Sequence, residues 1–340
     1  MSRLLPGTPP DLIITRTPLR VSFVGGGTDL AAFYEKEPGA VLSTAINRYV
    51  YVTVKRHSDL FFEPIRLNYS RSEEVNHVGE IKNNISRECL KFLDIEPPIY
   101  VSTVGDVPAS TGLGGSSAFT VGLLNALHVY RGERVTAGQL ADEACHIEID
   151  VLEEPIGKQD QYAAAFGGVN LFTFKSDGRV TVEHQQARNG SLRTLFDSML
   201  MFWTGHQRDA SGVLSEQREN TASKFARLRA MRDQVDELHA VLSRPDTDVR
   251  EIGALLHDGW EMKRELASAI SNTRIDEWYG RAVEAGAEGG KLCGAGGGGF
   301  LLFIVRPEHQ DAVRGALEEL VELPVEQETH GSMIVTPFAA

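Results

Sequence analysis

The sequence predicts an α+β protein of two domains. Its 340 residues are too many for one typical domain, since domains average roughly 150 residues. Strand-like runs mix with segments of helical periodicity, without the regular alternation that predicts a doubly wound parallel sheet. The composition shifts over 175–191, around KSDGRV and QQARNGS, so we expect domains at 1–185 and 186–340.

The first predicted domain begins with strands. RVSFVGGGTDL reads as a strand that breaks at Gly25, and residues 49–56 and 99–104 are rich in β-forming residues. A helix then follows, closed by Gly132, because four apolar residues recur at helical spacing: Ala118, Val121, Leu124 and Leu127.

Two more helices and a strand complete this domain. Thr136 can cap a helix that Pro155 stops, since a proline cannot continue a helix. GKQDQYAAAFGG predicts a short helix ended by two glycines, and VNLFTF predicts a strand over 169–174.

The second predicted domain is mostly helical. One amphipathic helix ends before Pro245, a second covers 249–269, and a third contains Trp278. CGAGGGGFLLFIV then leads into a strand, PEHQDAVRGALEEL into a helix, and GSMIVTPF into a final strand.

Charge and cysteine content narrow the class of protein. A net charge of −13 argues against unspecific nucleic-acid binding, and any positive charge around an anionic ligand must be local.

Cys89, Cys145 and Cys293 show no CxxC spacing, which fits a reduced intracellular protein. The start lacks a secretory apolar region, and FLLFIV, at 300–305, is too short to span a bilayer. We therefore expect a cytoplasmic protein without a membrane partner, and its oligomeric state stays open, a homodimer included.

Two familiar nucleotide motifs do not apply. The sequence contains no GxxxxGK[ST], the Walker-type phosphate loop. Gly294, Gly296 and Gly299 match GxGxxG, but they precede a strand, whereas a dinucleotide fingerprint follows a strand and opens a helix.

The stretch GDVPASTGLGGSSAFT, at 105–120, has the right setting for phosphate. Its glycines let backbone N–H groups approach an anion, and the helix that starts near Ser116 directs its positive end at the loop. A serine N-cap after a glycine turn is the structural alternative.

Three glycine clusters occur in order along the chain: FVGGGTDL, PASTGLGGSSA and KLCGAGGGGF. Together they resemble the motifs of the GHMP kinases (galactokinase, homoserine kinase, mevalonate kinase and phosphomevalonate kinase). The resemblance implies a two-domain α+β fold, with an N-terminal β-α-β domain of left-handed crossover and a ferredoxin-like C-terminal domain. It also implies ATP as co-substrate and Mg²⁺.

In this family the middle loop wraps the nucleotide phosphates. The resemblance implies that role for nine residues here: Pro108, Ser110, Thr111, Gly112, Leu113, Gly114, Gly115, Ser116 and Ser117. The family usually has serine where this chain has Gly115, which leaves the split of roles between Ser116 and Ser117 open. Ser116 matches the serine that binds Mg²⁺, and Glu148, 12 residues before Asp160, matches the second metal ligand. A surface helix glutamate is the alternative for Glu148.

Catalytic and sugar-binding roles follow from the same resemblance. Asp160 in GKQDQ matches the base that takes the proton of the substrate hydroxyl, and Arg20 in TPLR matches the basic residue beside it. Asp29 matches an aspartate that binds sugar hydroxyls; a helix cap is its alternative. The neighbouring glycine-motif residues are implied at the substrate as well: Gly26, Gly27, Thr28, Gly296 and Gly297.

The motif variants look closest to the D-glycero-D-manno-heptose 7-phosphate kinase branch, which phosphorylates the anomeric hydroxyl for bacterial surface polysaccharides. Its substrate needs a cationic subsite, for which His206 and Arg208, at the head of a helix, and Lys158 are the candidates. An L-fucose kinase-like or galactokinase-like sugar kinase is the alternative. A GHMP-fold sensor without turnover is a further one, against which the retained Arg20 and Asp160 argue.

Overall fold

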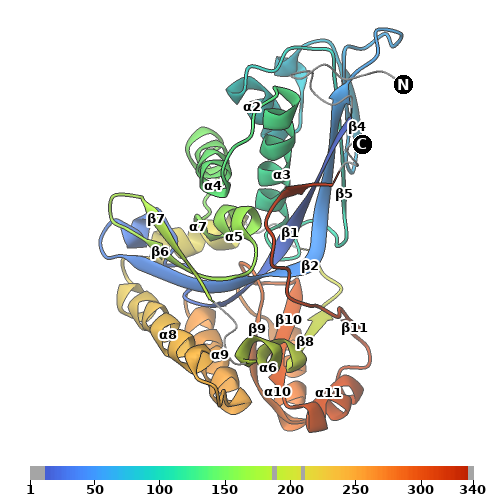
Figure 1. Cartoon of the computed structure of the whole chain (residues 1–340). Helices are drawn as coiled ribbons and strands as arrows, with labels where there is room; N and C mark the ends of the chain where they lie inside the picture. Colours follow the sequence, from blue (N-terminus) through green and yellow to red (C-terminus); the bar gives the residue numbers. More distant parts are fainter. Residues whose placement is uncertain (1–11, 186–189, 208–210, 336–340) are drawn as a thin grey trace.

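The computed structural model describes residues 12–185, 190–207 and 211–335, which form two β-sheets with helices packed on them (Figure 1). The larger sheet has the order β12-β1-β2-β5-β3-β4, and β6 and β7 extend from β2. Its strands are β1 (Leu12–Val24), β2 (Gly39–Arg56), β3 (Ile65–Asn68), β4 (Ser72–Val75), β5 (Ile99–Gly105), β6 (Val169–Phe174), β7 (Val180–His184) and β12 (Met333–Ile334).

The antiparallel pair β1 and β2 is the spine of this sheet. The pairing runs from Leu12 opposite Lys55 to Val24 opposite Leu42. One half of β2 pairs with β5 and the other half with β6, so a single long strand connects two parts of the sheet. The pair β3 and β5 is parallel, and the other pairs of this sheet are antiparallel.

Helices cover both faces of the spine. α3 packs on β1 and β2, with α4 and α5 beside it. α8, which belongs to the second half of the chain, packs against the same two strands (Figure 1). The helices of the first half are α1 (Ala31–Tyr34), α2 (Asn84–Phe92), α3 (Gly115–Tyr130), α4 (Ala137–Cys145) and α5 (Gln159–Phe166). A 3₁₀ turn covers Val78–Glu80, and α4 continues as a π-helical stretch over His146–Val151.

The smaller sheet has the order β11-β8-β10-β9, and its neighbouring strands are antiparallel. Its strands are β8 (Met199–Trp203), β9 (Ala287–Leu292), β10 (Phe300–Val305) and β11 (Val321–Glu322). Numbered along the chain, this is the 4-1-3-2 order of a ferredoxin-like sheet, as expected. The helices around it are α6 (Ser191–Asp197), α7 (Ser211–Asn220), α8 (Phe225–Ser243), α9 (Val249–Arg264), α10 (Thr273–Glu284) and α11 (Gln310–Ala316), with a 3₁₀ turn over Pro307–His309.

The prediction of an α+β fold is confirmed, and the differences lie mainly in strands. β2 begins at Gly39 rather than at residue 49, and β8 and β9 were not predicted in the second half. β9 has the sequence AEGGKL, which lacks a β pattern; it forms because β10 pairs with it and α9 packs on it. α9 ends at Arg264 rather than at residue 269. The domain boundary at 185/186, which lies between β7 and α6, and the left-handed crossover stay predictions.

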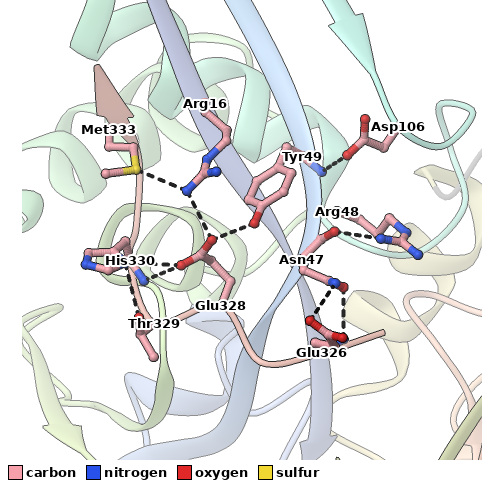
Figure 2. Close-up of polar contacts among 10 residues, drawn as sticks. All are labelled: Arg16, Asn47, Arg48, Tyr49, Asp106, Glu326, Glu328, Thr329, His330 and Met333. Carbon is pink, nitrogen blue, oxygen red and sulfur yellow. Dashed lines mark hydrogen bonds and ion pairs between the residues drawn. The ribbon is translucent and has the colours of Figure 1, made fainter. Parts of the chain in front are cut away.

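A return segment, residues 323–335, carries the chain back from the smaller sheet to the larger one (Figure 1). Its strand β12 pairs with β1, and Glu328 accepts hydrogen bonds from Arg16 (3.2 Å) and from the hydroxyl of Tyr49 (2.6 Å) (Figure 2). The segment therefore ties the last part of the described chain to both strands of the spine. No described helix has the length and apolar character needed to cross a membrane.

Candidate active site

The three glycine clusters meet at one cavity; we call them the first (23–30), middle (108–118) and third (291–300) glycine segments. It is lined by the end of β1 and the first glycine segment, the loop before α3, the start of α5, helices α7 to α9, β9 and the third glycine segment. Residues of both sheets and their helices therefore form its walls.

The middle and third glycine segments pack directly on each other. Gly112 has a φ of +82°, and a Cβ there would lie 2.5 Å from the carbonyl oxygen of Cys293. A Cβ on Gly294, whose φ is +72°, would overlap Gly112 in turn. Only glycine permits both the positive φ and this approach, which explains why two distant segments share this composition.

The start of α3 is open to an anion. Its N-cap is Gly114, with a φ of +76°, and no side chain caps the helix, so the alternative of a serine N-cap is wrong. The first-turn N–H groups and the positive end of the helix dipole are therefore free for a ligand. Ser116 is exposed and Ser117 is buried at this turn.

Glu148 is a buried carboxylate that forms no ion pair with a cationic side chain among the described residues. It is 1% exposed, which contradicts the alternative of a surface glutamate. It accepts hydrogen bonds of 2.8 Å from Ser116 Oγ and from Gln161 Nε2. Burial raises its pKa to about 7, and no cationic side chain of the described residues forms an ion pair with it. A buried carboxylate beside a serine hydroxyl fits Mg²⁺, which prefers oxygen ligands.

Arg20 and Asp160 form a bidentate ion pair in the cavity wall. Arg20 Nε and Nη2 each donate a hydrogen bond of 2.7 Å to the carboxylate of Asp160. Nη1 donates to the carbonyl oxygen of Gly112 at 2.6 Å. Arg20 is 5% exposed, so one buried guanidinium connects the carboxylate to the middle glycine loop.

Asp29 lies between the first glycine segment and the start of α5. Its carboxylate accepts from the backbone N–H groups of Gly27 (2.9 Å) and Gln159 (3.3 Å), and it does not cap α1. Burial, and then the charge of Asp160, raise the pKa of Asp29. A Cβ on Gly157 would overlap this carboxylate, so the glycine makes room for it.

Most of the predicted site residues line this cavity. They are Arg20, Gly26, Gly27, Asp29, Ser110, Thr111, Gly112, Gly114, Gly115, Ser116, Ser117, Glu148 and Asp160. They come from segments up to 140 positions apart, as the pair of Arg20 and Asp160 illustrates.

Other predicted residues lie outside the lining, each for a physical reason. Thr28 is buried and donates to the carbonyl oxygens of Gly25 and Ala40. Lys158 Nζ donates to the carbonyl oxygen of Gly178 at 2.7 Å and lies over the ring of Tyr34.

Five further residues are also absent from the lining: Leu113, which belongs to the apolar core, Pro108 and His206, which are exposed, and Gly296 and Gly297. Arg208 lies outside the described residues.

Several lining residues escaped the sequence analysis. Ser22 Oγ, Gln159 Oε1 and Gln234 Oε1 are buried and have no hydrogen-bond partner among the described residues. Lys263 of α9 and Lys291 of β9 also line the cavity. Three of them stood within quoted motifs: Ser22 in RVSFVGGGTDL, Gln159 in GKQDQ and Lys291 in KLCGAGGGGF. Gln234 and Lys263, in α8 and α9, carried no local signal.

Family models match both halves of the chain. The model of the GHMP kinases N terminal domain matches residues 76–168, and that of the GHMP kinases C terminal matches residues 225–323. Together they cover more than half of the sequence.

Individual proteins are similar over most of their length. The D-glycero-alpha-D-manno-heptose 7-phosphate kinase of Campylobacter jejuni is 29% identical over 306 residues, which are 87% of this chain and 90% of that protein. The mevalonate kinase of Methanothermobacter thermautotrophicus is 28% identical over 270 residues, covering 77% and 82%. The crystal structure of a D-glycero-D-manno-heptose 1-phosphate kinase from Bacteroides thetaiotaomicron has a TM-score of 0.78 at 24% identity, covering 96% of this chain and 100% of that one. This last likeness shows the shared fold.

Proposed function

Because the chain belongs to the GHMP kinases and is an ATP-dependent sugar kinase, we propose that its substrate is D-glycero-D-manno-heptose 7-phosphate. Phosphorylation of the anomeric hydroxyl gives the 1,7-bisphosphate, a precursor of bacterial surface polysaccharide. The similarity to the Campylobacter kinase, which extends over nearly the whole of both chains, supports this choice of sugar. The observation that carries the proposed chemistry is the bidentate pair of Arg20 and Asp160 beside the middle glycine loop.

The loop before α3 holds the nucleotide phosphates. Its glycine backbone and the uncapped N–H groups of α3 offer donors to phosphate oxygens, and the helix dipole favours their negative charge. Glu148 and Ser116 would hold Mg²⁺, which when bound neutralises charge on the phosphates of ATP.

Asp160 acts as the general base. It takes the proton of the anomeric hydroxyl while that oxygen forms its bond to the γ-phosphorus of ATP. The bond between the γ-phosphorus and the β–γ bridging oxygen breaks, and ADP leaves with that electron pair. Asp160 then holds the proton that the sugar has lost.

Arg20 orients the base and stabilises charge. Its two hydrogen bonds fix the plane of the Asp160 carboxylate, which accepts the proton. The same guanidinium lies against the carbonyl oxygen of Gly112 in the phosphate loop, where it counters charge on the transferring phosphoryl group.

The sugar lies against Asp29 and the unpartnered polar atoms of the cavity. Asp29 is already held by two backbone N–H groups and accepts hydrogen bonds from sugar hydroxyls with its remaining lone pairs. Ser22 and Gln234 have buried oxygen atoms without partners in the described chain, and hydroxyl groups of a sugar would satisfy them.

A substrate panel tests this proposal. Purified protein with Mg²⁺ and ATP is given heptose 7-phosphate, the unphosphorylated heptose, L-fucose or D-galactose, and ADP release is measured. We expect the highest kcat/KM with heptose 7-phosphate and a product that carries a new phosphate on C1 by ³¹P NMR. Faster turnover of L-fucose or free heptose would reassign the substrate. Thermal protection by sugar without any ADP release would instead favour a sensor.

A further inference from the structure

Two lysines of the cavity, the buried Lys291 and the partly buried Lys263, have no role in the chemistry described above. Lys263 Nζ donates to the carbonyl oxygen of Gly294, and Lys291 Nζ donates to that of Phe23 at 2.9 Å. Gly294 packs on the phosphate loop, and Phe23 begins the first glycine segment, two residues before Gly25. The two ammonium groups are therefore held at the third and first glycine segments, on the wall of the same cavity.

Neither lysine has an anionic partner within the part of the chain that the structure describes. No carboxylate of the described residues lies within 4.0 Å of either ammonium nitrogen, and Lys291 is only 7% exposed. Burial lowers the pKa of Lys263 to about 8 and that of Lys291 to about 7, the latter lowered further by the charge of Lys263. Buried charges without a partner destabilise a protein, so their presence in a cavity indicates an anionic ligand.

The neighbouring charged groups do not satisfy them. Arg20 and the thiol of Cys293 face both lysines, and Asp29 and Asp160 influence Lys263. Asp160 is engaged in its bidentate pair with Arg20, and Asp29 by backbone N–H groups. Of the three cations Arg20, Lys263 and Lys291, the two lysines are thus left for a ligand. A phosphate dianion offers both the charge and the acceptor oxygens.

We propose that Lys263 and Lys291 together bind a phosphate group of the reactants, in place of the subsite expected at His206, Arg208 and Lys158. The inference rests on the proposed kinase function. The phosphate is either the substrate's own or the phosphoryl group in transfer, and the two sources predict different kinetics. In either case a bound dianion raises the pKa of both lysines, so binding takes up protons near pH 7–8.

Methionine substitutions test the pair. Lys263→Met and Lys291→Met keep an unbranched side chain that is one atom shorter, and they remove its charge. Lys91→Met, at an exposed lysine of α2 paired with Glu88, is the matched control. kcat and KM are measured for heptose 7-phosphate and for the unphosphorylated heptose, and calorimetry in two buffers of different ionisation enthalpy gives proton uptake on binding.

If the lysines bind the substrate's own phosphate, KM for heptose 7-phosphate rises about 10- to 100-fold, the size expected for a lost charge-assisted hydrogen bond. The kinetic constants for the unphosphorylated heptose then stay unchanged. If they bind the phosphoryl group in transfer, kcat falls by the same factor for both sugars. In both cases proton uptake decreases, and the variants without ligand melt at or above the parent's temperature because a buried charge is gone.

Constants within twofold of the parent for both sugars, with unchanged proton uptake, would overturn the inference. So would a melting temperature lowered by more than about 5 °C with intact ligand affinity, since the lysines would then serve only to hold two carbonyl groups. Failure of the parent protein to use heptose 7-phosphate is a separate result: it refutes the proposed sugar, while the kcat of the lysine variants on the accepted sugar still tests the pair.

Discussion

The carboxylate of Asp160 accepts two hydrogen bonds of 2.7 Å from a single guanidinium, that of Arg20. The pair joins the start of α5 to β1, and the third donor of Arg20 reaches the carbonyl oxygen of Gly112 in the middle glycine loop. A carboxylate held in this way has one orientation, as a positioned base requires, and the guanidinium beside it can stabilise charge on a phosphoryl group.

Asp160→Asn is therefore expected to lower kcat by about 10²- to 10⁴-fold, the usual contribution of a positioned general base. Binding of Mg²⁺ and a non-hydrolysable ATP analogue should persist, because the phosphate loop is unchanged. Steady-state kinetics and calorimetry measure the two quantities. Turnover within a factor of ten of the parent would show that Asp160 is not the base.

Glu148→Gln tests the proposed metal ligand. The amide keeps the size of the side chain and can still bond with Ser116 and Gln161, but it lacks the charge that holds Mg²⁺. We expect the Mg²⁺ concentration at half-maximal activity to rise at least about tenfold. At pH 8 the variant without metal should melt at a higher temperature, since a buried carboxylate with a raised pKa is costly when ionised. A Mg²⁺ titration that superimposes on that of the parent would contradict the assignment.

Gly294→Ala tests the packing of the two glycine loops. The residue has a φ of +72°, and an added Cβ would overlap Gly112, so we expect a loss of roughly 1–3 kcal/mol in stability and weaker nucleotide binding. Gly280→Ala is the control, because Gly280 lies in α10 with open space around its Cα and gains helix propensity of about 0.5–1 kcal/mol. Chemical denaturation measures the stability of both variants. Equal stability of the two variants would mean that the loops separate without cost.

Glu328→Gln tests the return segment (Figure 2). Although burial opposes it, the hydrogen bond from Tyr49 and the charge of Arg16 help to lower the pKa of Glu328. Its stabilisation is then present above the pKa of an unfolded glutamate, about 4.3, and is lost as the pH falls through the lowered folded-state value. We expect the free energy of unfolding of the variant to be about 1–3 kcal/mol lower than that of the parent at pH 7. At a pH below the folded-state pKa of Glu328 we expect little difference.

Glu326→Gln is the matched control for this prediction. Glu326 belongs to the same segment, but its side chain meets the amide of Asn47 in an exposed contact of 3.4 Å (Figure 2). The substitution should change stability by less than about 0.5 kcal/mol at either pH. A similar loss in both variants would locate the effect in the segment as a whole rather than in Glu328.

Local patterns in the sequence were enough to predict much of the site. Through the resemblance to the GHMP kinases, the glycine clusters, TPLR, GKQDQ and the 12-residue spacing before Asp160 implied the phosphate loop, Arg20, Asp29, Asp160 and Glu148. These residues do meet at one cavity, and their roles stay predictions. Such patterns suffice because a glycine at positive φ or a carboxylate beside a phosphate is demanded at a fixed place in a motif.

Tertiary structure alone decided the rest. Lys263 and Gln234 reach the cavity because α9 and α8 pack against the spine of the larger sheet, and no local spacing encodes that approach. The same holds for Lys158, whose ammonium group turns to the carbonyl of Gly178 although it lies two residues from Asp160. A motif determines which chemistry a segment can perform, whereas burial and the direction of each side chain depend on which distant elements pack against it.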